Sequence, residues 1–196
     1  MKKSEIIGVL GGSFNPVHGG HLALAQSALV ELNLDRIYFV PARISPFKTA
    51  SVLVSAAHRL AMLRLALRAK KWARISKVEL DRPGASYTVD TVRFFRKRWR
   101  DDQIFLILGA DAAADFHRWK RSDIIAKNCF IVVGNRNKKS FTKLNTAFLK
   151  EGLKQPLPKV SSSQIRADLA KKKLSAQRYL DRAVYRYIIQ KKLYQS

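Results

Sequence analysis

A glycine-rich turn between an apolar run and a helical pattern constrains the fold of this chain most. The run 6–10 is apolar, the turn 11–21 reads Gly-Gly-Ser-Phe-Asn-Pro-Val-His-Gly-Gly-His, and apolar residues recur at helical spacing over 22–32. A strand that leads through such a turn into a helix presents unpaired backbone N–H groups at the positive end of the helix dipole. The pattern therefore predicts a phosphate site at the start of this helix.

Strands and helices alternate over the first 134 residues. Strands are expected at 6–10, 36–40, 74–79, 103–108 and 130–133, and helices at 20–32, 56–69, 88–99 and 110–118. This alternation predicts the α/β class, a Rossmann-like doubly wound parallel sheet covered by helices on both faces. Ligands of such sheets bind beyond the carboxyl ends of the strands, where the turns after Leu10, Val40 and Leu108 fall.

Residues 135–196 are expected to form a small C-terminal helical subdomain that packs on a core made by residues 1–134. Residues 135–159 are polar and basic and contain Pro156 and Pro158, so little regular structure is expected there. Two helical patterns follow near 163–173 and 181–194. Since the composition shows no clear boundary, we expect one domain over residues 1–196.

Composition narrows the functional classes. A single cysteine, Cys129, lies in an apolar run and is expected in the core, and no internal disulfide is possible. The sequence shows neither a signal segment nor an apolar stretch of about 20 residues, so a cytoplasmic protein without a membrane partner is expected. The formal charge of +24 would attract phosphorylated ligands, and a nucleic-acid partner stays open as an alternative.

His18 and His21 are the first candidate catalytic residues. They lie three residues apart at the expected helix start and can therefore face one bound group, while Gly19 and Gly20 let a ligand approach the backbone. As hydrogen-bond donors they suit charge that develops on phosphate in a transition state. A zinc site is the alternative, but it needs further ligands that no motif supplies.

Three consecutive serines before a late helical pattern indicate a second anion site. Ser161, Ser162 and Ser163 precede Arg166, which lies one turn into the expected helix. Hydroxyls, backbone amides and a guanidinium can together hold a polyphosphate. Helix capping alone would also explain one of these serines.

The two motifs together resemble those of the adenylyl- and cytidylyltransferase superfamily, HxGH after a GG-S/T-F turn and a late I-S-S-T/S-x-x-R. Three further stretches resemble bacterial nicotinate-nucleotide adenylyltransferases: residues 41–48, 86–91 and 109–119. The resemblance runs from about Ile6 to Tyr194. It has departures, because Asn15 stands where the family usually has Asp, and Val160 and Ser163 replace the commoner Ile and Thr.

The resemblance implies a reaction: nicotinate mononucleotide attacks the α-phosphate of ATP in line, without a covalent intermediate, and yields deamido-NAD and pyrophosphate for NAD biosynthesis. It implies Mg²⁺ that is bridged by the substrate phosphates and no metal held by the protein alone. The residues implied in catalysis are His18, His21 and Arg166.

The resemblance also implies two binding regions. Contacts to ATP and its phosphates are expected from Gly11, Gly12, Ser13, Phe14, Lys48, Gly109, Asp111, Ser162 and Ser163. Contacts to the mononucleotide are expected from Ser86, from the backbone amides of Tyr87 and Thr88, which would meet the pyridine carboxylate, and from Trp119, which would stack on the ring. Backbone donors prefer a carboxylate over an amide that brings its own donors.

Two alternatives remain open on the sequence alone. A sister transferase could use phosphopantetheine, glycerol phosphate or nicotinamide mononucleotide as the acceptor, although Ser86, Tyr87, Thr88 and Trp119 argue against it. The oligomeric state, monomer or homodimer, does not follow from the sequence.

Overall fold

The structure is a computed structural model that describes residues 4–44, 53–134 and 149–195. Its strands form a parallel sheet in the order β3-β2-β1-β4-β5-β6. The strands are β1 (Ile6–Gly12), β2 (Arg36–Pro41), β3 (Ala73–Ile75), β4 (Gln103–Gly109), β5 (Phe130–Gly134) and β6 (Leu149–Gly152). The order reverses between β1 and β4, which is the switch point at which doubly wound sheets bind ligands. The predicted α/β Rossmann-like class is confirmed.

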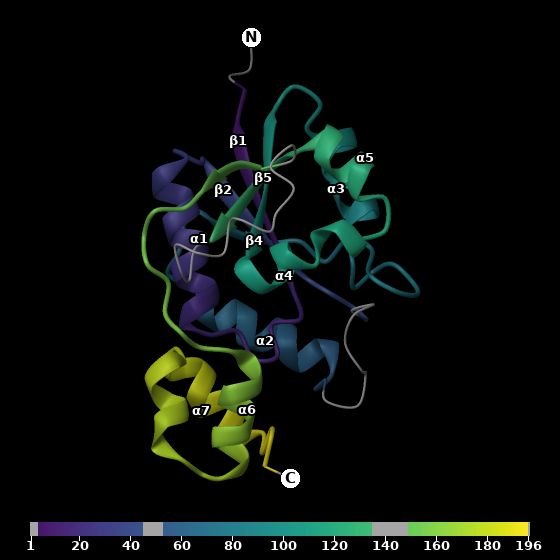
Figure 1. Cartoon of the computed structure of the whole chain (residues 1–196). Helices are drawn as coiled ribbons and strands as arrows, with labels where there is room; N and C mark the ends of the chain where they lie inside the picture. Colours follow the sequence, from purple (N-terminus) through teal and green to yellow (C-terminus); the bar gives the residue numbers. More distant parts are fainter. Residues whose placement is uncertain (1–3, 45–52, 135–148, 196) are drawn as a thin grey trace.

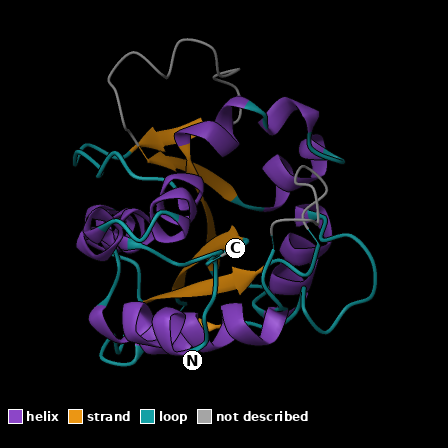
Figure 2. Ribbon diagram, turned by 90° about the horizontal axis from the view of Figure 1, so that it is seen from below, coloured by secondary structure: helices purple, strands orange, loops and turns teal. Residues whose placement is uncertain are grey.

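Helices lie on both faces of the sheet (Figures 1 and 2). The longer ones are α1 (Gly19–Glu31), α2 (Ala56–Leu67), α3 (Thr88–Arg98), α6 (Ser162–Ala170) and α7 (Arg182–Gln190). The shorter ones are α4 (Ala110–Ala114), α5 (Ser122–Asn128) and the 3₁₀ helices η2 (Phe116–Arg118) and η5 (Leu174–Tyr179). No helix in the described ranges is long and apolar enough to cross a membrane.

The central strand β4 is buried on both faces, which explains its apolar sequence. Phe105 and Ile107 belong to the buried cluster beneath α1, α2, α6 and α7, while Ile104, Leu106 and Leu108 belong to the cluster beneath α3 and α5. Successive side chains of a strand point to opposite faces, so a strand covered on both faces needs apolar residues at every position. Cys129 is buried in the second cluster as expected, and burial raises the pKa of its thiol to about 12.

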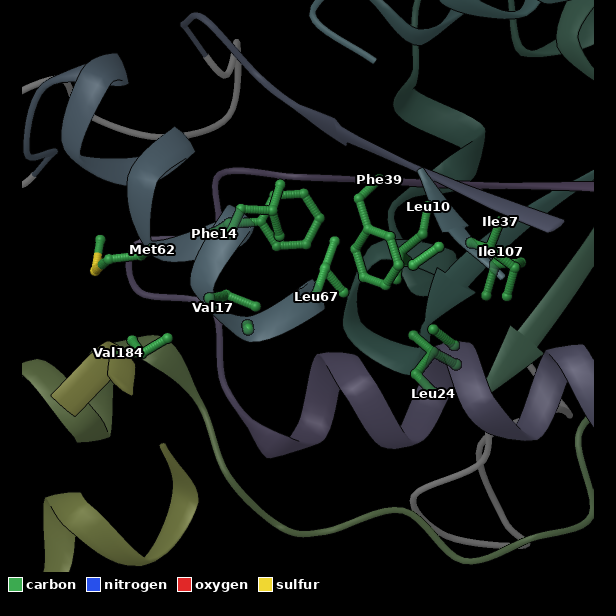
Figure 3. Packing of buried hydrophobic residues seen from close by; sticks show 14 of the residues in the cluster. Leu10, Phe14, Val17, Leu24, Ile37, Phe39, Met62, Leu67, Ile107 and Val184 are labelled. Carbon is green, nitrogen blue, oxygen red and sulfur yellow. The ribbon is translucent and has the colours of Figure 1, made fainter. Parts of the chain in front are cut away.

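The C-terminal helices share the first cluster. Val184 of α7 lies with Val17 and Met62 in the buried group shown in Figure 3, and α6 and α7 lie at one end of the sheet, beside α2 (Figure 1). This packing brings the late serine motif to the turn after β1.

Some expected elements differ from the structure. The strand expected at 74–79 is only Ala73–Ile75, because the ladder with β2 ends at the bond from the Ser76 N–H to the Phe39 carbonyl. The next donor on that side of β2 would be residue 41, and proline has no N–H. The expected helix 110–118 is divided at Asp115 into α4 and η2.

In the C-terminal part, β6 forms within the stretch 135–159 in which little regular structure was expected. The two late helices, α6 and α7, end earlier than expected, at Ala170 and Gln190, and the η5 turn separates them.

Candidate functional site

A cavity of about 760 Å³ opens at the switch point of the sheet. Gly11, Gly12 and Ser13 line it from the end of β1, and Gly109 and Asp111 line it from the end of β4 and the start of α4. The structure thus brings these five residues, predicted to bind ATP, to one cavity. Lys48 lies outside the described residues.

His18 and His21 cap the start of α1 with their rings. Nδ1 of His18 accepts a hydrogen bond from the Gly20 N–H at 3.1 Å, and Nδ1 of His21 accepts one from the His18 N–H at 3.3 Å. The ring centroids lie 3.8 Å apart. Because Nδ1 acts as the acceptor in both rings, the neutral imidazoles carry their proton on Nε2, and both Nε2–H groups can serve as donors.

Gly20 is needed for this capping arrangement. A Cβ at residue 20 would lie 3.0 Å from the His18 ring and 3.0 Å from the Val160 side chain. Any larger residue would therefore displace the ring that accepts from its own N–H. This contact explains the second glycine of the His-Gly-Gly-His motif.

Phe14 supports the histidines from the core. Its side chain is fully buried at a positive φ of 46°, and its ring packs edge-on against His21 with centroids 5.0 Å apart and against Phe39 at 5.9 Å. Phe14 is not among the residues that line the cavity. Its connection to the predicted ATP site is therefore indirect, through the His21 ring that it supports.

The serine motif reaches the same cavity from α6. Ser161 is the N-cap of α6 and accepts a hydrogen bond from the Gln164 N–H at 3.1 Å, which confirms a capping role for one serine. The Ser162 hydroxyl donates to the Pro16 carbonyl at 3.1 Å. Arg166 donates to the Asn15 carbonyl at 2.9 Å and to the Ser163 hydroxyl at 3.1 Å.

The three residues predicted to act in catalysis thus line one cavity, although almost 150 positions separate them in the sequence. His18 and His21 come from the start of α1, and Arg166 comes from the first turns of α6. Imidazole N–H groups, serine hydroxyls and a guanidinium are donors that suit phosphate oxygens. Such a set of donors is chemically able to bind an oxyanion.

The far side of the cavity combines a helix start with aromatic rings. Ser86, Tyr87 and Thr88 line it at the beginning of α3, whose N-cap residue Tyr87 makes no side-chain capping bond. Trp119 lines it from the chain after η2, and Nζ of Lys120 lies 4.2 Å from the centre of the Tyr87 ring. Backbone N–H groups beside an aromatic ring suit a planar ligand that bears a carboxylate.

Glu79 was missed by the sequence analysis, and it braces this side of the cavity. Its buried carboxylate accepts hydrogen bonds from the hydroxyls of Thr91 and Ser86, and the Ser86 hydroxyl accepts from the Arg43 N–H at 2.9 Å. Burial is the main cause that raises the pKa of Glu79, and the two hydroxyl donors oppose it. The network joins the start of α3 to the loop after β2, and no motif around residue 79 would have revealed it.

Arg59 was also missed, and it lies beneath the site at 2% exposure. Its guanidinium donates to the carbonyls of Ser13 at 2.9 Å and Ala42 at 2.7 Å, and at longer range to those of Val54 and Arg43. Burial lowers the pKa of Arg59. A sequence signal did exist, since residue 59 falls on the apolar helical stripe that includes residues 62, 63 and 66.

The described residues contain no group of three or more His, Cys, Asp or Glu side chains placed to hold a metal ion. Asp111 and Asp115 do line the cavity. This donor set fits a divalent ion that takes most of its oxygen ligands from a bound polyphosphate and water.

The chain is similar to known proteins of one family. Residues 9–168 match the family model described as cytidylyltransferase-like. The chain is 42% identical over 127 residues to a probable nicotinate-nucleotide adenylyltransferase of Rhodopirellula baltica, in a match that spans 65% of this chain and 59% of that protein. It is also 34% identical over 190 residues to a probable nicotinate-nucleotide adenylyltransferase of Bacillus licheniformis. That match spans 97% of this chain and 98% of that protein.

Solved structures show the same fold. The nicotinic acid mononucleotide adenylyltransferase of Plasmodium falciparum complexed with NaAD aligns with a TM-score of 0.78 at 19% identity and covers 97% of both chains. A sequence match over nearly the full length of a relative, a family model over most of the chain and the paired histidine and serine motifs all agree. The chain therefore belongs to the cytidylyltransferase-like family and, within it, to the nicotinate-nucleotide adenylyltransferases.

Proposed function

We propose that this chain transfers the adenylyl group of ATP to nicotinate mononucleotide, which gives deamido-NAD and pyrophosphate for NAD biosynthesis. One observation carries the proposal: a single cavity is lined by His18, His21 and Arg166 and also by the start of α3 and Trp119. The names of the relatives support the choice of substrates, since both are named as probable nicotinate-nucleotide adenylyltransferases.

The proposed chemistry needs no nucleophilic side chain. A phosphate oxygen of the mononucleotide attacks the α-phosphorus of ATP, and the bond between that phosphorus and the bridging oxygen of the β-phosphate breaks. Pyrophosphate leaves with the bonding electrons, and the attacking oxygen is already anionic, so no base has to remove a proton. The protein contributes position and charge stabilisation.

The residues would act on different parts of this path. His18 and His21 would donate their Nε2–H groups to the transferred and the leaving phosphates, held in place by the Nδ1 bonds at the start of α1. Arg166, Ser162 and Ser163 would hold the β- and γ-phosphates, together with the backbone of Gly11, Gly12 and Ser13. Bound Mg²⁺ would neutralise charge on the phosphate oxygens.

The other side of the cavity would select the mononucleotide. The Tyr87 and Thr88 amides would bind the pyridine carboxylate, and the Trp119 ring would stack on the pyridine. Asp111 would accept from the ribose hydroxyls of ATP. An amide in place of the carboxylate would point N–H donors at N–H donors, which disfavours nicotinamide mononucleotide.

Pyrophosphate release tests the proposal. Purified protein is incubated with ATP and Mg²⁺, together with nicotinate mononucleotide, nicotinamide mononucleotide or phosphopantetheine. We expect the highest kcat/KM with nicotinate mononucleotide and formation of deamido-NAD. If phosphopantetheine were the one acceptor of the three that gives turnover, the acceptor would have to be reassigned. If no acceptor led to pyrophosphate release, the proposed function would be rejected.

A further inference from the structure

Asn15 lies in the turn between β1 and α1, and its side chain joins two other parts of the chain. Its Oδ1 accepts a hydrogen bond from the Tyr194 hydroxyl at 2.7 Å and one from the Val54 N–H at 3.3 Å. A backbone N–H can only donate, so the amide oxygen, not the nitrogen, faces both partners. Asn15 is 1% exposed, and the loss of its acceptor would leave two half-buried donors without this partner.

The backbone of the same residue holds Arg166. The Asn15 carbonyl accepts from the Arg166 guanidinium at 2.9 Å, and the next bond of that guanidinium goes to Ser163 at 3.1 Å. Any shift of residue 15 therefore moves the group that fixes Arg166 in the cavity. Asn15 itself is also part of the cavity wall.

Tyr194 reaches this point from the chain that follows α7. It has a positive φ of 62°, and the neighbouring Leu193 is buried in the cluster beneath α7. Burial raises the pKa of Tyr194 well above its ordinary value of 10, and the guanidiniums of Arg166 and Arg59 only partly oppose this shift. The phenol therefore keeps its proton in the neutral pH range and remains a donor to Asn15.

We propose that Tyr194 and Asn15 form a positioning pair that orients Arg166 for the triphosphate. Tyr194 acts through Asn15: its hydroxyl fixes the side chain of residue 15, and the carbonyl of residue 15 fixes the guanidinium. The function of position 15 is that of a hydrogen-bond acceptor and does not need a charge, which explains why Asn can stand where Asp is usual. The inference rests on the proposed function in one respect, the assignment of Arg166 to ATP phosphates.

Two measurements test the pair: the ATP dissociation constant in the presence of Mg²⁺, and kcat with the mononucleotide. Tyr194→Phe removes only the hydroxyl. We expect it to raise the ATP dissociation constant and lower kcat by about threefold to tenfold each, the size of one lost hydrogen bond. KM for the mononucleotide should change less than twofold, because Trp119 and the start of α3 are not part of the pair.

A matched control exists in α7, the helix that precedes Tyr194. The Tyr187 hydroxyl bonds Nδ1 of His58 at 2.9 Å, away from the cavity wall, so Tyr187→Phe removes one comparable phenolic hydrogen bond. We expect Tyr187→Phe to bind ATP like the parent. An equal loss of ATP affinity in both variants would show that Tyr194 only stabilises the fold, and would overturn the proposal.

Substitutions at Asn15 complete a double-mutant cycle. Asn15→Leu removes the acceptor, so in its background Tyr194→Phe should have no further effect on ATP affinity, whereas independent effects would multiply and contradict the pair. Asn15→Asp keeps Oδ1 and should bind ATP at least fivefold more tightly than Asn15→Leu. If Asn15→Leu does not fold, Asn15→Ala replaces it in the cycle, because it also lacks the acceptor, and Tyr194→Phe should again have no further effect on ATP affinity in that background.

ATP binding separates this inference from the function. A parent that binds ATP but releases no pyrophosphate with any acceptor would reject the proposed function and leave the pair testable by affinity. A parent that turns over normally, with Tyr194→Phe unchanged in both ATP affinity and kcat, would reject the pair and leave the function intact.

Discussion

Replacing Arg59 by methionine should destabilise the protein by about 2–4 kcal/mol. The two short bonds to the Ser13 and Ala42 carbonyls would be lost, and each buried carbonyl left without a donor costs about 1–3 kcal/mol. The longer bonds to Val54 and Arg43 add less. Part of this loss of stability is offset, because the substitution also removes the buried charge of Arg59. That charge has no carboxylate partner in the described ranges.

Urea unfolding of Arg59→Met and of the parent would measure this difference. With a slope of about 2 kcal/mol per molar urea, the expected loss lowers the midpoint by about 1–2 M. Arg64→Met is the matched control, since Arg64 is exposed on the same helix and its replacement removes the same charge. That control should stay within about 0.5 kcal/mol of the parent. An Arg59→Met midpoint equal to that of Arg64→Met would refute the assigned role of the four carbonyl bonds.

Three further predictions follow from the cavity. His21→Ala should lower kcat about 100-fold or more with the fold retained, as expected for one lost transition-state donor, and steady-state kinetics with parent-like kcat would exclude that role. Trp119→Ala should raise KM for the mononucleotide much more than KM for ATP, and the opposite pattern would mean that the two ends of the cavity are exchanged. Glu79→Gln should make stability less dependent on pH. The pKa of Glu79 in the folded protein lies above its ordinary value of 4.5, so its contribution to the free energy of unfolding is fully present below pH 4.5 and is lost as the pH rises through the raised pKa. The urea midpoint of the parent should therefore fall over this pH range, and the midpoint of the variant should not show this fall.

The sheet could be predicted from local sequence because its central strands are covered on both faces. The run Ile104–Leu108 is apolar at every position, and the turn after β1 combines glycines with two histidines at a helix start. Such signals lie within a few neighbouring residues. The sequence also contains the cause of the early end of β3, since Pro41 has no N–H to donate to the β2–β3 ladder. Only the register of β2 and β3 shows which hydrogen bond is missing.

Elements that depend on distant partners could not be predicted. The strand β6 has four residues, Leu-Lys-Glu-Gly, without a clear period, and it forms by pairing with β5. The seven-residue helix α5 begins after Arg121 in a left-handed conformation, which its sequence does not favour.

The candidate site divides in the same way. Motifs indicated His18, His21 and Arg166, whereas the bonds from Asn15 to Val54 and Tyr194 join residues that are close only in the folded chain. Glu79 belongs to the same class, because the chain brings its partners Thr91 and Ser86 close to it only after the turn that follows β3 has formed. Sequence motifs thus predict the groups that line the cavity better than the groups that hold them in place.

A crystal structure with a non-hydrolysable ATP analogue would show whether the three candidate catalytic residues share one ligand. We expect Nε2 of His18 and of His21 and the guanidinium of Arg166 all to lie within hydrogen-bond distance of oxygens on one triphosphate, with the Nδ1 bonds at the start of α1 retained. A triphosphate bound away from either histidine, or bound with Arg166 turned to a different ligand group, would contradict this expectation.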